Sequence, residues 1–381
     1  MKLSNKKNLG WLDRKLEGLR SFDGSLLGYV GSSPAITHVA AGNDVNSSKV
    51  LKLDANENFF VDPRFLNEVF AEVLKDVDLR FYDSKAVADL AKALGRYVNV
   101  PPESVVVGSG SEQLIDFIVQ FFLEKGDEAI SIVPSFFMYE KRVGLSGAKL
   151  ISVPLRNDLS LDVDAVLEKV TAKTKLIFVC SPNNPTGNQF GWAEIEALAD
   201  NSSAVVVLDE AYAEFGDYSA CSSAVDKRNV IVVRTFSKAF GLAGLRFGFA
   251  VAHQDLALVF SSIIPYTVGT ITSRYVQKLL DKVAVVQEWT EMAKKERERL
   301  VKGLRAVDGI DVMDSKANFV TFKPHVSANN VYSELLRKGI VVKDLGDLPV
   351  IGHCLRVSVG LPNMNNQFLK AISEIINSAR Y

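Results

Sequence analysis

The chain has 381 residues, enough for a large core and two domains, and its formal net charge of -1 gives no support for a nucleic-acid or membrane partner. Three widely spaced cysteines argue against a disulfide framework and suit a reducing, cytoplasmic location. The four histidines show no metal-ligand spacing, so no metal is expected. The polar N-terminus lacks the apolar core of a signal peptide.

Residues 1–50 are weakly patterned and rich in Gly, Ser and Asn, which predicts an arm or lid. Residues 51–58 then read as a short strand running into a polar turn. Apolar spacing predicts helices over 86–98, 114–123, 192–200 and 283–304, and Ser327 is expected to cap a helix that closes at Gly339.

Short apolar runs alternate with these helices. They predict strands at 105–107, 129–133, 176–180, 204–208 and 230–233, with further strands at 318–322, 340–342 and 354–359. The first five runs are continuously apolar, which favours burial on both faces of a largely parallel sheet with helical crossovers. We therefore expect an α/β fold with a smaller α+β part near the C-terminus.

Polar motifs follow each of the first five strands. In open parallel sheets, ligands bind outside the carboxyl ends of the strands, so several motifs in that position are better evidence than any one alone. Residues 108–112, Gly-Ser-Gly-Ser-Glu, lie between a strand and a helix, where backbone N–H groups can bind an anion. They match neither a dinucleotide fingerprint nor a P-loop, and a plain tight turn would look the same.

Lys238 follows the last of these strands, among apolar and small residues. Loss of hydration disfavours the ammonium form, so the amine becomes a usable nucleophile for a Schiff base. Ser237 and Arg246 add a hydroxyl and a fixed cation that would suit a phosphate. A surface lysine in a turn is the alternative, and this stretch alone does not decide between them.

Pyridoxal phosphate needs a lysine, an anion site, a carboxylate at the pyridine nitrogen, donors to the ring 3-oxygen and a flat apolar cover. Lys238 is the candidate lysine, and Asp209 is the candidate carboxylate. The anion site would be formed by Ser111, Glu112, Ser237 and Arg246. Asn184 and Tyr212 are the candidate donors to the 3-oxygen, and Phe136 is the candidate ring cover. An Asp that caps a turn and a plain core aromatic remain the ordinary alternatives for Asp209 and Phe136.

On these residues the chain resembles the fold-type I aminotransferases of the class I/II group, and within it the histidinol-phosphate aminotransferases. The matching stretches are 53–58, 108–112, 180–187, 209–212, 237–246 and 355–360. The resemblance covers about residues 50–380 and implies a seven-stranded-type, mostly parallel sheet flanked by helices, with a small domain built from both chain ends. The predicted division is 1–50 arm, 51–80 small domain and linker, 81–285 large cofactor domain and 286–381 small domain.

The resemblance also implies roles for single residues. Lys238 would form the Schiff base with the cofactor and then move the proton of the substrate. Arg356 matches the arginine that binds the carboxylate of glutamate, and Asn56 and Lys343 are placed at the substrate. Tyr82 matches a tyrosine that reaches the cofactor phosphate of the neighbouring subunit, which implies a homodimer with shared sites.

The chain departs from the family at a few positions. Phe59 and Asp83 stand where the family usually has Pro, and Lys343 stands where it often has Arg. A lysine is a point charge without the bidentate fork of a guanidinium, so phosphate recognition is expected to differ.

The implied partners are a small amino donor and a 2-oxo acid, and the implied reaction is transamination between L-histidinol phosphate and 2-oxoglutarate. An aminotransferase for aromatic or other amino acids, and a lyase like the phosphothreonine decarboxylases, share the scaffold and stay open. Consumption of a keto acid would separate them. A non-catalytic scaffold is disfavoured because both Lys238 and Asp209 are present.

Overall fold

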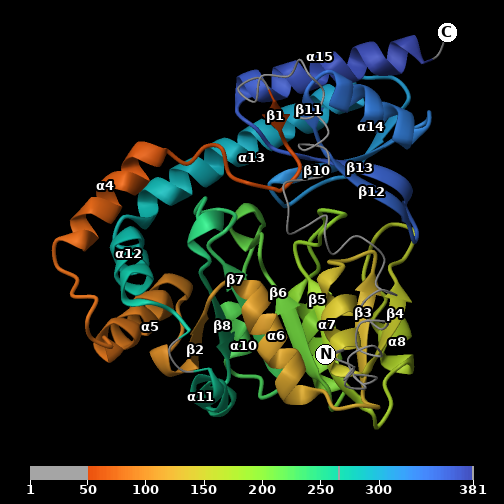
Figure 1. Ribbon diagram of the computed structural model, residues 1–381. Helices are drawn as coiled ribbons and strands as arrows, with labels where there is room; N and C mark the ends of the chain where they lie inside the picture. The colour runs from red at the N-terminus through yellow and green to blue at the C-terminus, as the bar shows by residue number, and fades with distance from the viewer. Residues whose placement is uncertain (1–49, 265–266, 380–381) are drawn as a thin grey trace, which may run out of the picture.

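The computed structural model describes residues 50–264 and 267–379. A seven-stranded sheet with helices on both faces forms the larger part, and a four-stranded sheet with two helices forms the smaller part (Figure 1). The predicted α/β class, with a smaller α+β portion, is confirmed. The predicted arm over residues 1–50 lies outside the described residues except for Val50.

The large sheet has the strand order β2-β8-β7-β6-β5-β3-β4. Its strands are β2 (Val105–Gly108), β3 (Glu128–Val133), β4 (Lys149–Pro154), β5 (Thr174–Cys180), β6 (Val205–Asp209), β7 (Val230–Thr235) and β8 (Gly248–Ala252). The pairs from β4 to β7 are parallel, and β8 is antiparallel to both neighbours. The prediction of a mostly parallel sheet is therefore confirmed. Strands β4 and β8 were not among the predicted strands.

Apart from the edge strand β4, which is partly exposed, the strands of this sheet bury residues on both faces, which explains the continuous apolar runs. Val207 and Ile231 pack with α6 (Ser111–Phe122), α7 (Met138–Ser146) and α11 (Gln254–Ile263). Val206 and Val232 point the other way and join a second cluster that includes α9 (Trp192–Asp200). Alternate side chains of a strand thus pack against two different helical layers.

Short helices form parts of the connections: η3 (Pro102–Ser104), α8 (Val163–Glu168), η4 (Ala213–Phe215), α10 (Cys221–Ala224) and η5 (Ala243–Leu245).

Four helices flank the sheet and lead to the smaller part (Figure 1). They are α4 (Pro63–Leu74), α5 (Ser84–Val98), α12 (Thr270–Leu280) and α13 (Val283–Arg305). Asp83 caps α5 by accepting from the Ala86 N–H at 2.9 Å, and Asn99 ends it in the left-handed conformation. The predicted domain division stays a prediction; its boundary at residue 285 falls within α13, which continues without a break.

The smaller part holds a four-stranded antiparallel sheet in the order β12-β13-β10-β9. Its elements are β9 (Ile310–Val312), β10 (Phe319–Pro324), α14 (Ala328–Arg337), β12 (Lys343–Leu348), β13 (Gly352–Ser358) and α15 (Pro362–Ser378). Ser327 caps α14, as expected. β1 (Leu51–Lys52) pairs in parallel with β11 (Ile340–Val341), so the beginning of the described chain joins its end.

Candidate active site

The carboxyl ends of β2, β3, β5, β6 and β7 lie at the same edge of the large sheet. The four parallel strands share one direction, and β2 shares it because both β2 and β7 are antiparallel to β8. The predicted cofactor residues other than Tyr82 follow these ends or the adjoining turn before β8. The structure therefore brings together, at one edge, side chains that lie up to 135 residues apart in the sequence, from Ser111 to Arg246.

Lys238 lies just beyond β7, and its side chain is partly buried. Its Nζ donates to the Ala55 carbonyl at 2.9 Å and lies 5.8 Å from the centroid of the Tyr212 ring. Burial, together with a smaller effect of the nearby Arg356 cation, lowers the pKa of the amine to about 8. Near neutral pH an appreciable fraction of this amine is uncharged, as a nucleophile or a base requires.

Asp209 is the last residue of β6 and is 3% exposed. Its Oδ2 accepts from the Tyr139 hydroxyl at 2.8 Å, and its Oδ1 accepts from the Ala211 N–H at 3.0 Å. Burial raises the pKa of this carboxyl to about 6, against the opposing effect of these two hydrogen bonds. A carboxylate that is buried without a cation beside it is costly, and a protonated nitrogen of a ligand would offset that cost.

The turn after β2 forms a cradle with Arg246. Gly110 has φ 89° and precedes α6, which begins without a side-chain cap, so the first backbone N–H groups of the helix, at Ser111 and Glu112, are not used within it. A Cβ at Gly110 would lie 2.9 Å from Arg246 Nη2, and a Cβ at Gly248 would lie 2.6 Å from the Ser111 nitrogen. Glycine is required at both positions because the backbone and the guanidinium approach so closely.

Two hydroxyls and a strained arginine complete the cradle. Arg246 has φ 55°, a conformation that costs a non-glycine residue about 1–2 kcal/mol, and its Nη2 lies 3.8 Å from Glu112 Oε2. The Thr235 hydroxyl donates to Ser237 Oγ at 3.0 Å. Backbone N–H groups at a helix start, a hydroxyl and a guanidinium form a donor set suited to a phosphate.

The expected ring contacts come from three further residues. Phe136 is half-buried and packs edge-on against Tyr139, with the ring centroids 5.6 Å apart. The Tyr212 hydroxyl accepts from Asn56 Nδ2 at 3.0 Å. Asn184 Oδ1 accepts from the Arg356 guanidinium, so its amide nitrogen is the group left to donate to a ligand.

The predicted substrate residues lie on the smaller part. Arg356 on β13 donates to the Asp54 carbonyl at 2.9 Å and stands over the Phe319 ring, 5.1 Å from its centroid. Lys343 on β12 is directly opposite Arg356 in the strand register. Asn56 is 1% exposed with φ 55°, and its N–H donates to Ser358 Oγ at 2.8 Å. The site is thus assembled across the junction of the two parts.

Tyr82 is the exception among the predicted residues. It lies between α4 and α5, its side chain is 86% exposed, and Phe81 and Leu79 beside it are 65% and 66% exposed. Its predicted role in a neighbouring subunit stays a prediction.

Sequence reasoning missed several residues that shape this site. Tyr139 donates to Asp209, and Asn318 Nδ2 donates to the Asn56 carbonyl at 2.9 Å. Phe319 packs edge-on against Tyr212 at 5.2 Å and lies under Arg356. Tyr139 could have been found from its place after the β3 motif, whereas Asn318 precedes and Phe319 begins β10, whose sequence gives no hint of its neighbours.

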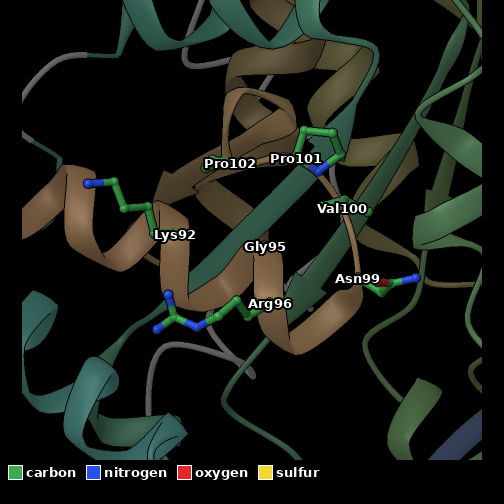
Figure 2. A pocket seen from close by; sticks show the side chains of 7 residues that line it. All are labelled: Lys92, Gly95, Arg96, Asn99, Val100, Pro101 and Pro102. Atoms are coloured by element: carbon green, nitrogen blue, oxygen red, sulfur yellow. The ribbon is translucent and has the colours of Figure 1, made fainter.

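Two cavities lie outside this site. One of about 520 Å³ is bordered by the end of α5 and the following turn, with Lys92 and Arg96 on its rim (Figure 2). The other, of about 510 Å³, lies between α13 and the loop after η4. Neither is lined by Lys238 or Asp209. Within residues 50–264 and 267–379, no cluster of His, Cys, Asp or Glu has metal-site geometry, and no helix there is long and apolar enough to cross a membrane.

The chain matches known proteins over most of its length. The family model for class I and II aminotransferases matches residues 48–372. The histidinol-phosphate aminotransferase of Ruminiclostridium cellulolyticum is 35% identical over 331 residues, which make up 85% of this chain and 92% of that protein.

Solved structures with the same fold include proteins of two activities. The histidinol-phosphate aminotransferase from Sinorhizobium meliloti in complex with pyridoxal-5'-phosphate has a TM-score of 0.79 at 24% identity, covering 90% of this chain and 98% of that one. L-threonine-O-3-phosphate decarboxylase from Porphyromonas gingivalis has a TM-score of 0.74 at 20% identity, covering 86% and 100%. These two structures share the fold, and the family match identifies the group: the chain belongs to the class I and II aminotransferases.

Proposed function

We propose that this protein uses pyridoxal phosphate to move an amino group between L-histidinol phosphate and 2-oxoglutarate, a step of histidine biosynthesis. The observation that supports it most is the pairing of a lysine of lowered pKa with a buried, unneutralised carboxyl, Asp209, at the edge that also holds the glycine-lined cradle. The donor is proposed from the name of the relative that shares 35% identity over 85% of the chain.

The residues present fit this cofactor. The Ser111 and Glu112 N–H groups, Ser237 and Arg246 would hold its phosphate. Asp209 would face the pyridine nitrogen, Asn184 and Tyr212 the 3-oxygen, and Phe136 the ring face. The cradle admits no extra Cβ at Gly110, and the buried Asp209 lacks a cation among the described residues, so both features suit a phosphorylated, protonated heterocycle.

Bound pyridoxal phosphate supplies an aldehyde for the amino group and a ring that withdraws electrons. The chain supplies positioning and proton transfer. The Lys238 amine, with a pKa of about 8, takes the proton from the donor Cα. Asp209 keeps a positive charge on the heterocycle, and Tyr139 fixes that carboxylate by its hydrogen bond. Arg356 binds the carboxylate of glutamate through its planar guanidinium.

We also propose a homodimer with shared sites and a cytoplasmic location. The exposed aromatic side chains of Phe81 and Tyr82 support a subunit contact at this loop, because large apolar groups gather where a partner covers them. The three cysteines are all buried and unpaired, which suits a reducing compartment.

A single-turnover experiment on the holoenzyme tests the reaction. L-histidinol phosphate should shift the visible absorption band of the bound cofactor, and 2-oxoglutarate should restore it. A shift with phenylalanine or tyrosine but not with L-histidinol phosphate would assign the protein to another donor. Carbon dioxide release from phosphothreonine, with no keto acid consumed, would make it a lyase and overturn the proposal.

A further inference from the structure

Asn56 lies in a buried hydrogen-bond network at the junction of the two parts, and it is 1% exposed. Its N–H donates to Ser358 Oγ at 2.8 Å, and its carbonyl accepts from Asn318 Nδ2 at 2.9 Å. Its φ of 55° is left-handed, a conformation that asparagine adopts more readily than most residues. The backbone of Asn56 is therefore fixed on both sides of the peptide plane.

The residues on either side of Asn56 contact the turn that carries the lysine. The Ala55 carbonyl accepts from Lys238 Nζ at 2.9 Å. Asn58 Nδ2 donates to the Ala239 carbonyl at 2.8 Å. Asn56 is thus placed beside the Lys238 turn by its own chain neighbours, and its side chain has one defined direction.

That side chain is bonded to the Tyr212 hydroxyl. Asn56 Nδ2 donates to the Tyr212 oxygen at 3.0 Å, and the Tyr212 ring packs edge-on against Phe319, which fixes the plane of the ring. The hydrogen of a phenol lies near the ring plane and can point to either side of the oxygen. An amide hydrogen on one side directs the phenol hydrogen to the other, because two hydrogens that face each other repel.

We propose that Asn56 is a positioning residue: its amide orients the Tyr212 hydroxyl so that the phenol donates its hydrogen to the 3-oxygen of the cofactor. The predicted contact of Asn56 with the substrate would require this buried amide to leave Tyr212. The inference rests on the proposed function, in which Tyr212 faces the 3-oxygen.

The test follows the visible absorption band of the bound cofactor against pH, in the holoenzyme without substrate. A donor to the 3-oxygen weakens the hold of that oxygen on the proton that it shares with the bound Lys238 nitrogen, so this proton leaves at lower pH. Asn56→Gly removes the amide, and glycine accepts the left-handed φ. The midpoint of the band should therefore rise by about 0.5–1 pH unit, the effect of roughly one hydrogen bond.

A double-mutant cycle shows whether Asn56 acts through Tyr212. In a Tyr212→Phe background, Asn56→Gly should move the midpoint no further, because the hydroxyl that it orients is absent. Ser358→Ala removes the oxygen that accepts from the Asn56 N–H, and it serves as the second variant if Asn56→Gly folds poorly. It should cause a smaller rise, which Tyr212→Phe should also abolish.

Asn99→Gly is the matched control for the change from asparagine to glycine. Asn99 also has a left-handed φ, 56°, and it lies exposed at the end of α5. Its midpoint should stay at the value of the wild type.

Half-reactions separate orientation of the phenol from contact with the donor. With L-histidinol phosphate and with glutamate, Asn56→Gly should lower the rate at saturation about three- to tenfold, and the donor concentration at half-maximal rate should change less than about twofold. A loss confined to the half-maximal concentration of L-histidinol phosphate would mean direct contact and would overturn the inference.

The midpoint also gives clear contrary results. An unmoved midpoint, a further shift in the Tyr212→Phe background, or a shift to lower pH, which would mean that the amide oxygen faces the phenol, would each overturn the inference. The predicted shifts in a protein that does not convert L-histidinol phosphate would support the role of Asn56 and overturn only the proposed donor. Absence of the visible band in the wild type with added cofactor would overturn the proposed function and this inference with it.

Discussion

Strands β6 and β7 carry two clusters of buried charge only a few residues apart. In the first, Arg234 forms ion pairs with Glu210 at 3.3 Å and with Glu214 at 2.6 Å. Burial lowers the pKa of Arg234, but the two carboxylates outweigh it and hold the pKa well above its ordinary value. In the second, Asp209 and Lys238 have no ion-pair partner among the described residues.

The difference separates structural charges from functional ones. Arg234 and its carboxylates neutralise one another inside the chain, so the cluster needs nothing from outside. Asp209 and Lys238 are bound only by a phenol, backbone groups and an aromatic face, and both pKa values move toward the neutral form. Buried ionisable groups that lack an ion-pair partner are candidates for a functional site, because a bound ligand can supply the missing charge or hydrogen bond.

Lys238→Met should give the largest effect in the unpaired cluster. The variant loses the amine that binds the cofactor and moves the proton, so turnover should fall by at least about 10³-fold. The cofactor-free protein should remain as stable as the wild type in urea, because an apolar side chain replaces a poorly hydrated amine. Lys338→Met, an exposed lysine on the small part, is the control. Retention of a tenth of the activity would contradict the assignment.

Arg234→Met should have the opposite profile. Removal of the guanidinium leaves Glu210 and Glu214 buried without a cation, which should lower the free energy of unfolding by about 3–5 kcal/mol. Activity per folded molecule should change little. Arg305→Met, which breaks an exposed pair with Asp314, should cost less than about 1 kcal/mol in the same urea titration. A mild effect of Arg234→Met would remove the distinction between the clusters.

Asp209→Asn should lose activity and gain stability. The neutral amide cannot hold a protonated heterocycle, so we expect turnover to fall about 10²-fold. In the cofactor-free protein the Asp209 pKa is raised to about 6, so ionisation costs about 3 kcal/mol at pH 7. A raised pKa makes this contribution to the unfolding free energy fall as pH rises from about 4 to about 6. Urea titrations of both proteins across that range should diverge, with the variant more stable at pH 7.

Tyr139→Phe should have the smallest effect. The phenol donates to Asp209 and lowers its pKa, so the variant should raise that pKa and cost about 1 kcal/mol in stability. The acid limb of the pH profile of kcat/KM for the holoenzyme should move to higher pH if Asp209 controls it. An unmoved limb, with the same loss of stability, would show that Tyr139 is only a packing residue.

The strand-end motifs were predictable because the pattern that makes them is local. An apolar run that stops at a polar residue marks both the end of a buried strand and the edge where ligands bind, so Asp209 and Lys238 could be found in the sequence. An apolar run does not reveal whether its strand is parallel or antiparallel to its neighbours in the sheet. Gly248–Ala252 is as apolar as its neighbours but runs antiparallel, because the chain turns directly after Arg246 instead of crossing over through a helix.

The contacts that finish the site could not be predicted in the same way. Asn56 meets Ser358 and Asn318 only because two distant segments pack against each other, and no local pattern encodes such a meeting. The lowered pKa of Lys343 likewise depends on a register match with Arg356 across two strands. Long-range packing therefore decides what the residues named by their motifs can do.

The pairing of β1 with β11 has a consequence for how the protein is made. The Asn56 N–H forms a hydrogen bond with Ser358, 302 residues later in the chain, and Leu51 pairs with Ile340 in the two-stranded sheet. During translation, Lys238 and the large sheet therefore leave the ribosomal exit tunnel well before the C-terminal residues that complete the site around Lys238. During that interval the nascent chain has its amine at an open strand edge, and only the last part of translation converts a foldable sheet into an enzyme.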